Sequence, residues 1–292
     1  EFLREGSAVK DFMKPDRIVV GCNDEYSSNV IKDIYKSFSP VDMLITNNKT
    51  AEMIKYANNT FLATLISFSN EIGNLCATQE NVDSLEVMRG VHLDNRVNPI
   101  LKSQRINPGI ISYLKAGCGF GGSCFPKDLS AAISFGKSQN QKMLLLNAVR
   151  NVNQAQPIKI LETINKRFKN NIKNKNITVL GLAFKEGTDD MRESPSIPII
   201  NAFIKYKANV VAYDPVAKKE AKKVLKLKNI MYAKSMNSAI RNADIIVILA
   251  PWPEFKNLHN EINKQKLKPL IVDGRRFLNK ENFKNYIGIG LG

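Results

Sequence analysis

The 292-residue sequence has little cysteine, little histidine and no long apolar run. Its four cysteines (Cys22, Cys76, Cys118 and Cys124) are too few for a disulfide framework in so long a chain, and their spacing matches no zinc ligand set. The longest uncharged apolar stretch, 245–253, has nine residues, whereas roughly 20 are needed to span a bilayer. No signal-like apolar run opens the sequence. These absences predict a soluble protein of the reducing cytoplasm, with no metal site and no membrane association.

Histidine is equally scarce, with only His92 and His259, and neither lies near the motifs described below. A hydrolytic Ser–His or Cys–His triad is therefore disfavoured. We interpret both histidines as structural or surface residues.

Acidic residues are the minority charge, with 27 Asp and Glu against 43 Lys and Arg and a net charge of +16. Such a surplus can indicate nucleic acid or another polyanion. However, much of it is Lys interleaved with Asn and Ile, as in 170–175 and 218–228, which is typical of solvated helix faces and loops. Clusters of Arg interleaved with aromatics, which stack on bases, are absent. We therefore expect no nucleic-acid partner, and a small anionic substrate remains compatible with the charge.

The length and the 43 % hydrophobic and 24 % charged composition are those of a globular protein of one large or two medium domains. The pattern near the N-terminus predicts the tail of an α/β unit, with a strand at 17–21, a helix at 24–38 and a strand at 41–46.

The next stretch, 50–79, holds no Pro and one Gly, and its apolar residues recur at helical spacing. It predicts a single helix of about 45 Å at 1.5 Å per residue, so we expect part of it to pack against another subunit. A second helix is predicted at 81–91, a loop-rich stretch at 94–122, and helices from 127 to 168 with a kink or break at Pro157.

In the C-terminal part of the sequence, short apolar segments typical of strands alternate with segments typical of helices. Strands are predicted at 177–182, 210–213, 230–232, 245–249 and 270–272, and helices at 197–205, 217–227, 235–243 and 254–264. Strands that alternate with helices predict a parallel, doubly wound α/β sheet.

The sharpest motif is Gly119-Phe-Gly-Gly-Ser-Cys-Phe-Pro-Lys-Asp128. Pro126 suits the first turn of a helix, so Cys124 is predicted just before a helix N-terminus, where exposed N–H groups favour the nucleophilic thiolate. Asp128 follows one turn later, on the same side. A buried structural cysteine is the alternative. The overlapping G-x-G-x-x-G at 117–122 is interpreted as a coincidental match, because no β-branched strand precedes it and no acidic residue follows about 20 positions on.

Two further sets of residues suit an anionic substrate. Lys55 and Asn59 share a helix face and have the chemistry to stabilise an oxyanion, although a Lys on a helix is usually only solvated. The charged loop 184–194 follows the first strand of the doubly wound sheet, where ligands bind, which places Lys185 and Arg192 to meet phosphates. Asp214 and the segment 273–276 close later strands; ordinary surface loops are the alternative.

Together these motifs resemble those of the UDP-glucose/GDP-mannose dehydrogenase family, and most closely its UDP-glucose branch. The 119–128 string, the opening 1–6, the segment 55–59, the loop 184–194 and the segment 273–276 occur in the family's order. The resemblance implies an N-terminal NAD-binding Rossmann domain of which 1–48 is the remnant, a central helical dimerisation and catalytic region at 49–156, and a C-terminal UDP-sugar-binding Rossmann-like domain at 157–292. Most of the first domain is expected to be missing and the chain alone to be inactive.

The resemblance also implies an activity. It is the NAD-dependent four-electron oxidation of UDP-glucose at C6 to UDP-glucuronate, through a cysteine thiohemiacetal and thioester, for polysaccharide precursor synthesis. GDP-mannose or a UDP-N-acetylhexosamine as the substrate, and a truncated, non-catalytic UDP-sugar-binding module, remain the alternatives. A homodimer is expected.

The resemblance assigns roles to individual residues. Cys124 is the expected nucleophile, Lys55 and Asn59 the oxyanion-stabilising pair, and Asp128 the residue that positions or deprotonates water, with Glu5 as a second candidate. The expected substrate residues are Glu1, Phe2, Leu3, Tyr113, Leu114, Lys115, Gly121, Phe184 and Lys185, with either Arg96 or Arg105 contributed by a partner subunit. The expected cofactor residues are Lys127, Arg192 and Arg275.

Overall fold

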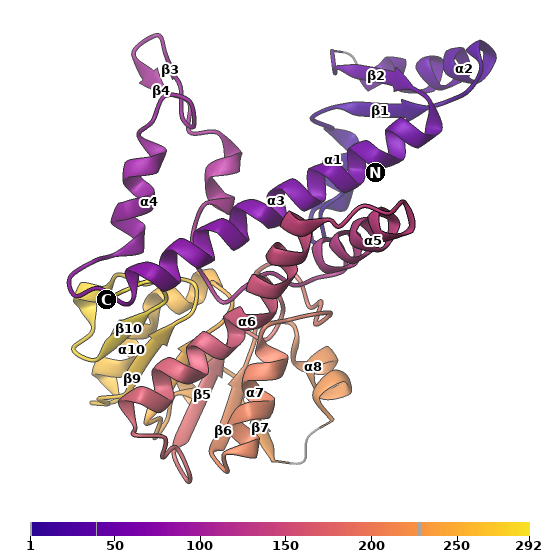
Figure 1. Cartoon of the computed structure of the whole chain (residues 1–292). Coiled ribbons are helices and arrows are strands. Elements are labelled where there is room, and N and C mark those ends of the chain that lie inside the picture. The colour runs from indigo at the N-terminus through magenta and orange to yellow at the C-terminus, as the bar shows by residue number, and fades with distance from the viewer. Residues whose placement is uncertain (1, 39, 227–228) are drawn as a thin grey trace. The chain divides into compact units, whose positions relative to one another are not determined.

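The computed structural model describes residues 2–38, 40–226 and 229–292 (Figure 1). It consists of two compact units, residues 1–61 and 62–292. Among the described residues, no helix is both long and apolar enough to cross a lipid bilayer.

The first unit contains a small parallel strand–helix–strand arrangement. After the short helix α1 (Ala8–Met13), strand β1 (Ile18–Gly21) leads to α2 (Glu25–Tyr35), the 3-10 turn η1 (Lys36–Phe38) and strand β2 (Met43–Thr46). β1 and β2 pair in parallel, with Ile18 opposite Met43. The Asp24 carboxylate caps α2 by accepting a hydrogen bond from Ser27 N at 2.7 Å. The predicted strand, helix and strand are confirmed.

Helix α3 (Asn48–Cys76) is a single rod of 29 residues, as the long apolar periodicity predicted. Its one glycine, Gly73, faces Ala116, and a Cβ added there would lie 2.6 Å from the Ala116 Cβ. Ala63 of α3 packs with Leu129, Ile133 and Val149 in a small apolar cluster of the second unit.

The helical part of the second unit continues with α4 (Ser84–His92), α5 (Phe125–Ser138) and α6 (Leu144–Arg167). The stretch predicted as loop holds a hairpin of β3 (Ile100–Leu101) and β4 (Gln104–Arg105) and a 3-10 helix, η2 (Gly109–Tyr113).

Pro157 does not break α6, which contains it. A proline removes a single backbone donor, and the buried neighbours Gln156, Ile160 and Ile164 hold the helix against the rest of the unit.

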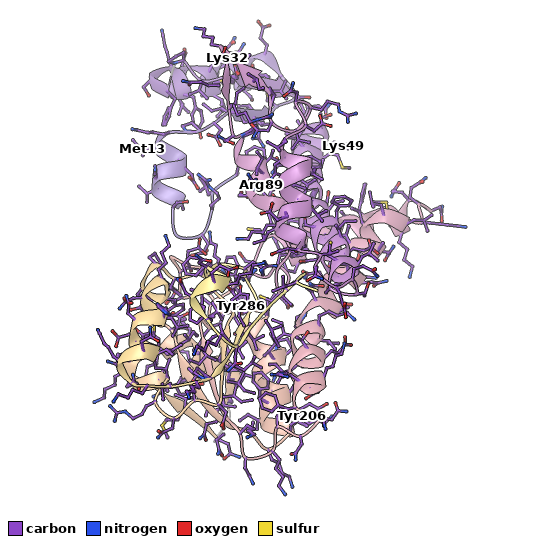
Figure 2. All side chains as sticks on the ribbon, turned by 90° about the vertical axis from the view of Figure 1, so that its left-hand side faces the viewer. Met13, Lys32, Lys49, Arg89, Tyr206 and Tyr286 are labelled. Atoms are coloured by element: carbon purple, nitrogen blue, oxygen red, sulfur yellow. The ribbon has the colours of Figure 1, made fainter. Side chains whose placement is uncertain are left out.

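The C-terminal part is built on a six-stranded, wholly parallel sheet, which confirms the predicted fold class. Its strands are β5 (Asn176–Leu180), β6 (Asn209–Tyr213), β7 (Ile230–Tyr232), β8 (Ile245–Ile248), β9 (Leu270–Asp273) and β10 (Tyr286–Gly288). The order is β10-β9-β8-β5-β6-β7. The sequence analysis missed β10, because only three residues form it and they follow a polar, charged segment. The Tyr286 hydroxyl, labelled in Figure 2, donates to Asp273 Oδ2 at 3.1 Å and ties β10 to β9.

Helices cover both faces of this sheet, as parallel sheets require. The helices that follow α6 are α7 (Ser196–Lys205), α8 (Lys218–Leu225), α9 (Met236–Ala239) and α10 (Leu258–Lys264), with 3-10 turns η3 (Pro253–Asn257) and η4 (Lys280–Asn282). Alternate strand residues serve the two faces: Ile177 and Val179 pack in one core with α6, α7 and α8, and Ile246 and Ile248 in another with α9 and α10. The strand order reverses between β5 and β8, so a ligand crevice is expected at their carboxyl ends.

Candidate active site

Cys124 occupies the N-cap position of α5 and is exposed. Its Sγ lies 3.7 Å from the Ser123 Oγ. Of the other three cysteines, Cys76 and Cys118 are buried and Cys22 is partly exposed, and burial raises the pKa of the Cys118 thiol. Cys124 is therefore the most exposed of the four thiols, and it lies at a helix end whose partial positive charge favours thiolate.

The glycines before Cys124 permit a very close approach between two loops. A Cβ added to Gly121 would overlap the Glu193 carbonyl oxygen, and one added to Gly122 would lie 2.8 Å from the Phe184 ring. Gly122 also holds φ at +82°, a region that favours glycine, and its N–H donates to Arg192 O at 2.8 Å. The glycines thus bring the Cys124 loop against the loop that follows β5.

Three amide side chains that were not predicted from the sequence fix the same loop from two helices; those of Asn70 and Gln156 are buried and that of Asn153 is partly buried. Asn70 Oδ1 of α3 accepts from Gly117 N at 2.7 Å, and Gln156 Nε2 of α6 donates to Gly117 O at 2.9 Å. Asn153 makes a paired bond with Phe120, accepting from its N–H at 2.7 Å and donating to its carbonyl at 3.0 Å. No local sequence pattern distinguishes these residues, because their partners lie 33–47 residues away in the chain.

Arg275, just after β9, joins three segments with one guanidinium. Its Nε donates to Leu249 O at 2.7 Å, Nη1 to Gly119 O at 3.0 Å and Nη2 to Phe184 O at 3.0 Å. A planar fork suits three separated acceptors better than an ammonium group does. Arg275 therefore positions both loops of the site, and its predicted contact with cofactor phosphates stays a prediction.

A cavity of about 320 Å³, here called the Lys185 cavity, opens at the carboxyl edge of the sheet. Four residues predicted to bind substrate line it together: Lys115, Gly121, Phe184 and Lys185. Further lining residues follow β5, β8 and β9, so the cavity lies at the expected reversal of strand order. Desolvation in this setting lowers the pKa of Lys115 below its usual value, with Arg276 and Arg275 acting in the same direction and Asp273 opposing them.

A second cavity, of about 560 Å³ and here called the Arg192 cavity, is lined in part by residues on either side of Cys124 in the chain. Lys127, Arg150 and Arg192 supply cations to its wall, and Phe120 lines both cavities. Ser123 lines this cavity and Phe125 lines the Lys185 cavity. In the sequence, Cys124 therefore lies between a residue of one cavity and a residue of the other. Two of the three predicted cofactor residues, Lys127 and Arg192, share this cavity.

Arg192 is held by a carboxylate at the cavity edge. Its Nε and Nη2 donate to Asp190 Oδ1 and Oδ2, each at 2.9 Å. Burial alone would raise the pKa of Asp190, but the hydrogen bonds from the Arg192 side chain and backbone outweigh it and lower that pKa. The pair fixes a guanidinium at the rim, where anions are attracted.

Asp128 lies inside the first turn of α5, with 1 % of its surface exposed. Its N–H donates to Cys124 O at 2.9 Å, and the Lys127 Nζ lies 3.3 Å from its Oδ1. Asp128 thus follows Cys124 by one turn at the start of α5, and its predicted role toward water stays a prediction.

The remaining predicted residues of the first unit are described within that unit alone. Phe2 and Leu3 line a cavity of about 340 Å³, where the Arg17 guanidinium lies 3.9 Å above the Phe2 ring. Lys55 and Asn59 lie on α3. Glu5 is exposed, and Glu1 lies outside the described residues. The roles of these residues toward Cys124 stay predictions.

Neither candidate for the substrate arginine lines the Lys185 or Arg192 cavity. Arg96 is exposed and forks onto Asp94, which lowers the pKa of that carboxyl to about 2. Arg105 lies in the β3–β4 hairpin and donates to Asn98 O at 2.9 Å. Near Cys124, Leu114 is buried and the ring of Tyr113 lies 6.2 Å from that of Phe125.

Asp214 and Asp273, which close β6 and β9, are structural. Asp214 accepts from the backbone N–H groups of Leu182, Ala183, Val216 and Ala217 and from the Trp252 indole. Asp273 accepts from three backbone N–H groups and the Tyr286 hydroxyl. Carboxylates so fully satisfied organise the loops at the crevice rather than bind a ligand.

Comparison with known proteins identifies matching domains along the chain. Within the UDP-glucose/GDP-mannose dehydrogenase family, the NAD binding domain matches residues 1–39, the central domain 49–155 and the UDP binding domain 178–280.

Individual relatives agree with this match. The chain is 41 % identical to the UDP-glucose 6-dehydrogenase of Rickettsia conorii, covering 97 % of this chain and 63 % of that protein. It is 39 % identical to UDP-glucose 6-dehydrogenase TuaD of Bacillus subtilis, covering 97 % and 58 %. Among solved structures, a UDP-glucose dehydrogenase from Pyrobaculum islandicum matches with a TM-score of 0.87 and 35 % identity, over 100 % of this chain and 62 % of that one. The chain thus spans about three fifths of the length of these relatives.

Proposed function

This chain belongs to the UDP-glucose/GDP-mannose dehydrogenase family, and from that premise we propose that it carries the chemistry of an NAD-dependent UDP-glucose 6-dehydrogenase with Cys124 as the nucleophile. The observation that carries the proposal is the exposed Cys124 at the start of α5, set in the chain between residues of two neighbouring cation-lined cavities. The same cavities suit a diphosphate-bearing sugar on one side of the thiol and a phosphate-bearing cofactor on the other.

The proposed reaction proceeds in four steps. The C6 alcohol loses a hydride and a proton to give an aldehyde, and the Cys124 thiolate adds to the aldehyde carbon, forming a thiohemiacetal once its oxyanion is protonated. Loss of a second hydride and a proton gives a thioester. Water then attacks the thioester carbonyl, the C–S bond breaks, and a carboxylate and the free thiol are released. Covalent attachment keeps the reactive aldehyde in the site between the two oxidations.

Two NAD⁺ molecules, binding in turn, would each accept one of the two hydrides. Lys127 and Arg192 are the residues of the Arg192 cavity that would hold the phosphates of the cofactor. The cavity wall fits such a group because Lys127, Arg150 and Arg192 converge on it, and Ser123 offers a hydroxyl beside them.

The remaining catalytic roles follow the family resemblance. Lys55 and Asn59 are proposed to stabilise the oxyanion, and Asp128 to position the hydrolytic water, with Glu5 as the second candidate. For the sugar nucleotide, Lys115 and Lys185 supply the positive charge of the Lys185 cavity and Phe184 an aromatic wall. UDP-glucose is preferred over GDP-mannose or a UDP-N-acetylhexosamine because the curated relatives above are UDP-glucose 6-dehydrogenases.

The capture step is testable without NAD. The C6 aldehyde of UDP-glucose, labelled with ¹³C at C6, is mixed with the protein and followed by NMR. We expect a protein-bound thiohemiacetal carbon signal that disappears in Cys124→Ser. Cys22→Ser, which removes a second accessible thiol, is the matched control and should leave the signal intact.

Two results would count against the proposal. If no bound carbon signal forms, or if it persists in Cys124→Ser, Cys124 is not the nucleophile. If the aldehyde binds reversibly without capture, the non-catalytic UDP-sugar-binding module becomes the better assignment.

A homodimer and a cytoplasmic setting complete the proposal. Exposed apolar residues of α3, Phe68 and Leu75 at 47 % and 63 % exposure, lie seven residues apart and so recur on one helix face. A second copy of the chain would cover this face. All four cysteines are free thiols, which supports a reducing compartment.

A further inference from the structure

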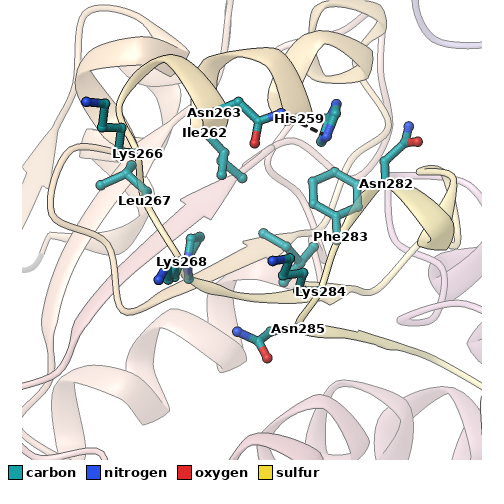
Figure 3. A pocket seen from close by; sticks show the side chains of 12 residues that line it. His259, Ile262, Asn263, Lys266, Leu267, Lys268, Asn282, Phe283, Lys284 and Asn285 are labelled. Carbon is teal, nitrogen blue, oxygen red and sulfur yellow. Dashed lines mark hydrogen bonds between the residues drawn. The ribbon is translucent and has the colours of Figure 1, made fainter.

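A separate cavity of about 360 Å³, here called the Lys268 cavity, opens at the opposite, amino-terminal edge of the six-stranded sheet (Figure 3). It is bounded by the end of α10 and by the segments that enter β9 and β10. Lys268 precedes β9, whereas Arg275 of the Lys185 cavity follows it. The strand therefore separates the two cavities.

The lining combines an apolar surface with positive charge. Ile262, Leu267 and Phe283 supply the apolar part, and Lys266, Lys268 and Lys284 the cations. Among the lining residues that the structure describes, none is Asp or Glu. A cavity of this size suits a small organic ligand rather than a single ion.

The aromatic side of the cavity is itself organised. The Phe283 ring meets the His259 ring edge-on, with centroids 5.7 Å apart, and stacks on Tyr286 at 6.2 Å. His259 Nε2 lies 2.9 Å from Asn263 Nδ2, which holds the imidazole in place (Figure 3). Rings fixed in this way offer a planar ligand a stacking surface at low entropic cost.

The positive charge of the cavity is not neutralised within the fold. The carboxylate of Glu261 on α10 is bound by Lys264 at 2.7 Å. None of the ion pairs identified in the described part of the chain involves Lys266, Lys268 or Lys284. Residues 157–292 also hold 26 of the 43 basic residues but only 12 of the 27 acidic ones, so the surrounding field favours an anion.

From this combination we propose that the Lys268 cavity binds a phosphorylated ligand with an aromatic ring, of the nucleotide class, at a second site distinct from the one at Cys124. The ring packs on Phe283 and the apolar residues, and the phosphates meet the lysine ammonium groups. The Lys268 cavity lies at the amino-terminal edge of the sheet and the Lys185 cavity at the carboxyl edge. Ligand binding at the Lys268 cavity therefore does not depend on dehydrogenase chemistry at Cys124.

The test uses methyl-labelled protein and ADP as the probe. Ile262 and Ile271 line the Lys268 cavity, while Ile66 lines the Lys185 cavity, so the three methyl signals report the two sites separately. We expect ADP to shift the Ile262 and Ile271 signals saturably. Adenosine and inorganic pyrophosphate, which offer only the ring or only the charge, should each bind at least about tenfold more weakly.

Charge-reversal variants localise the effect. Lys268→Glu with Lys284→Glu should weaken ADP binding at least about tenfold, because two charge-assisted contacts become repulsive. Lys173→Glu with Lys219→Glu changes the net charge equally at exposed positions outside the cavity lining and should leave the affinity within about twofold.

Three outcomes would overturn the proposal. One is the absence of Ile262 and Ile271 shifts at about 10 mM ADP, well above useful affinity. Another is equal weakening by both variant pairs, which would indicate general surface charge. The third is equal affinity for pyrophosphate and ADP, which would remove the nucleotide class.

Discussion

Around Cys124, individual residues act mainly by placing the backbone. Gly121 and Gly122 allow two loops to touch, Asn153 and Gln156 pin the loop from α6, and Arg275 joins it to the ends of β5 and β8. The thiol is therefore presented by a network of main-chain hydrogen bonds. Substitutions in this network should therefore act through the geometry and stability of the Cys124 loop rather than through its charge.

Gly121→Ala tests the close approach of the two loops. Its Cβ would overlap a backbone carbonyl, that of Glu193, which cannot turn aside as a side chain would. We expect the free energy of unfolding to fall by about 1–3 kcal/mol, the usual cost of overpacking, in urea denaturation monitored by circular dichroism. Gly109→Ala is the matched control, since no atom lies within 4 Å of its added Cβ. Equal stability of the two variants would contradict the packing argument.

Lys115 should make sugar-nucleotide binding sensitive to alkaline pH. A lowered pKa means that its proton leaves below the ordinary lysine value of 10.5, and the uncharged amine no longer attracts a diphosphate. We expect the affinity for UDP to be constant near neutrality and to fall as the pH rises through that lowered pKa, in calorimetric titrations.

The corresponding variant isolates this group. Lys115→Met should bind UDP about tenfold more weakly at neutral pH, the worth of one charge-assisted contact, and should lose the earliest part of the alkaline decline. Lys219→Met, at an exposed position of α8, should keep the original profile. An unchanged profile in Lys115→Met would exclude its role.

Among the elements, α3 leaves several large apolar side chains exposed, Phe68 and Leu75 among them. Phe68→Glu together with Leu75→Glu should convert the expected dimer into a monomer, because two charges would be buried in an apolar contact. Light scattering coupled to size exclusion measures the mass directly. Val224→Glu on α8, a comparably exposed apolar position at 46 %, should leave the mass unchanged. A wild-type protein that is monomeric at high concentration would refute the prediction.

The sheet acts as the second organising element, since its order decides where ligands bind. The reversal between β5 and β8 opens the crevice of the Lys185 cavity. The carboxylate oxygens of Asp214 and Asp273 accept hydrogen bonds from backbone N–H groups and a hydroxyl at that edge. The crevice therefore keeps its shape without a ligand.

At the scale of the whole molecule, substrate and cofactor are expected to bind unequally to this chain. The Lys185 cavity lies entirely within one unit. By contrast, the end of β1 and the turn that leads to α2 hold a single glycine, Gly21, whereas a dinucleotide-binding turn uses three. We therefore expect calorimetry to detect UDP-glucose binding, and NAD⁺ to bind weakly or not at all. Tight NAD⁺ binding with no UDP-glucose binding would reverse this assignment of the two cavities.

Local sequence was enough to predict most of the long helices and strands and the position of Cys124 at the start of a helix. Short apolar runs alternating with helical segments predicted the parallel sheet, uninterrupted helical periodicity predicted α3, and the Gly119–Asp128 string predicted Cys124 just before a helix. These features depend on neighbours a few residues apart, which is why a pattern reveals them.

The tertiary structure decided which distant segments meet. The sequence predicted that Arg275 contacts phosphates. The structure adds that its guanidinium donates hydrogen bonds to three backbone carbonyls, from segments up to 156 residues away. Asn70, Asn153 and Gln156 gave no local signal, and β10 was too short to be found. Pro157 predicted a kink or break, and α6 continues through it without a break. Each of these outcomes depends on contacts between residues far apart in the chain, which form only when the sheet and helices pack, and no local pattern encodes them.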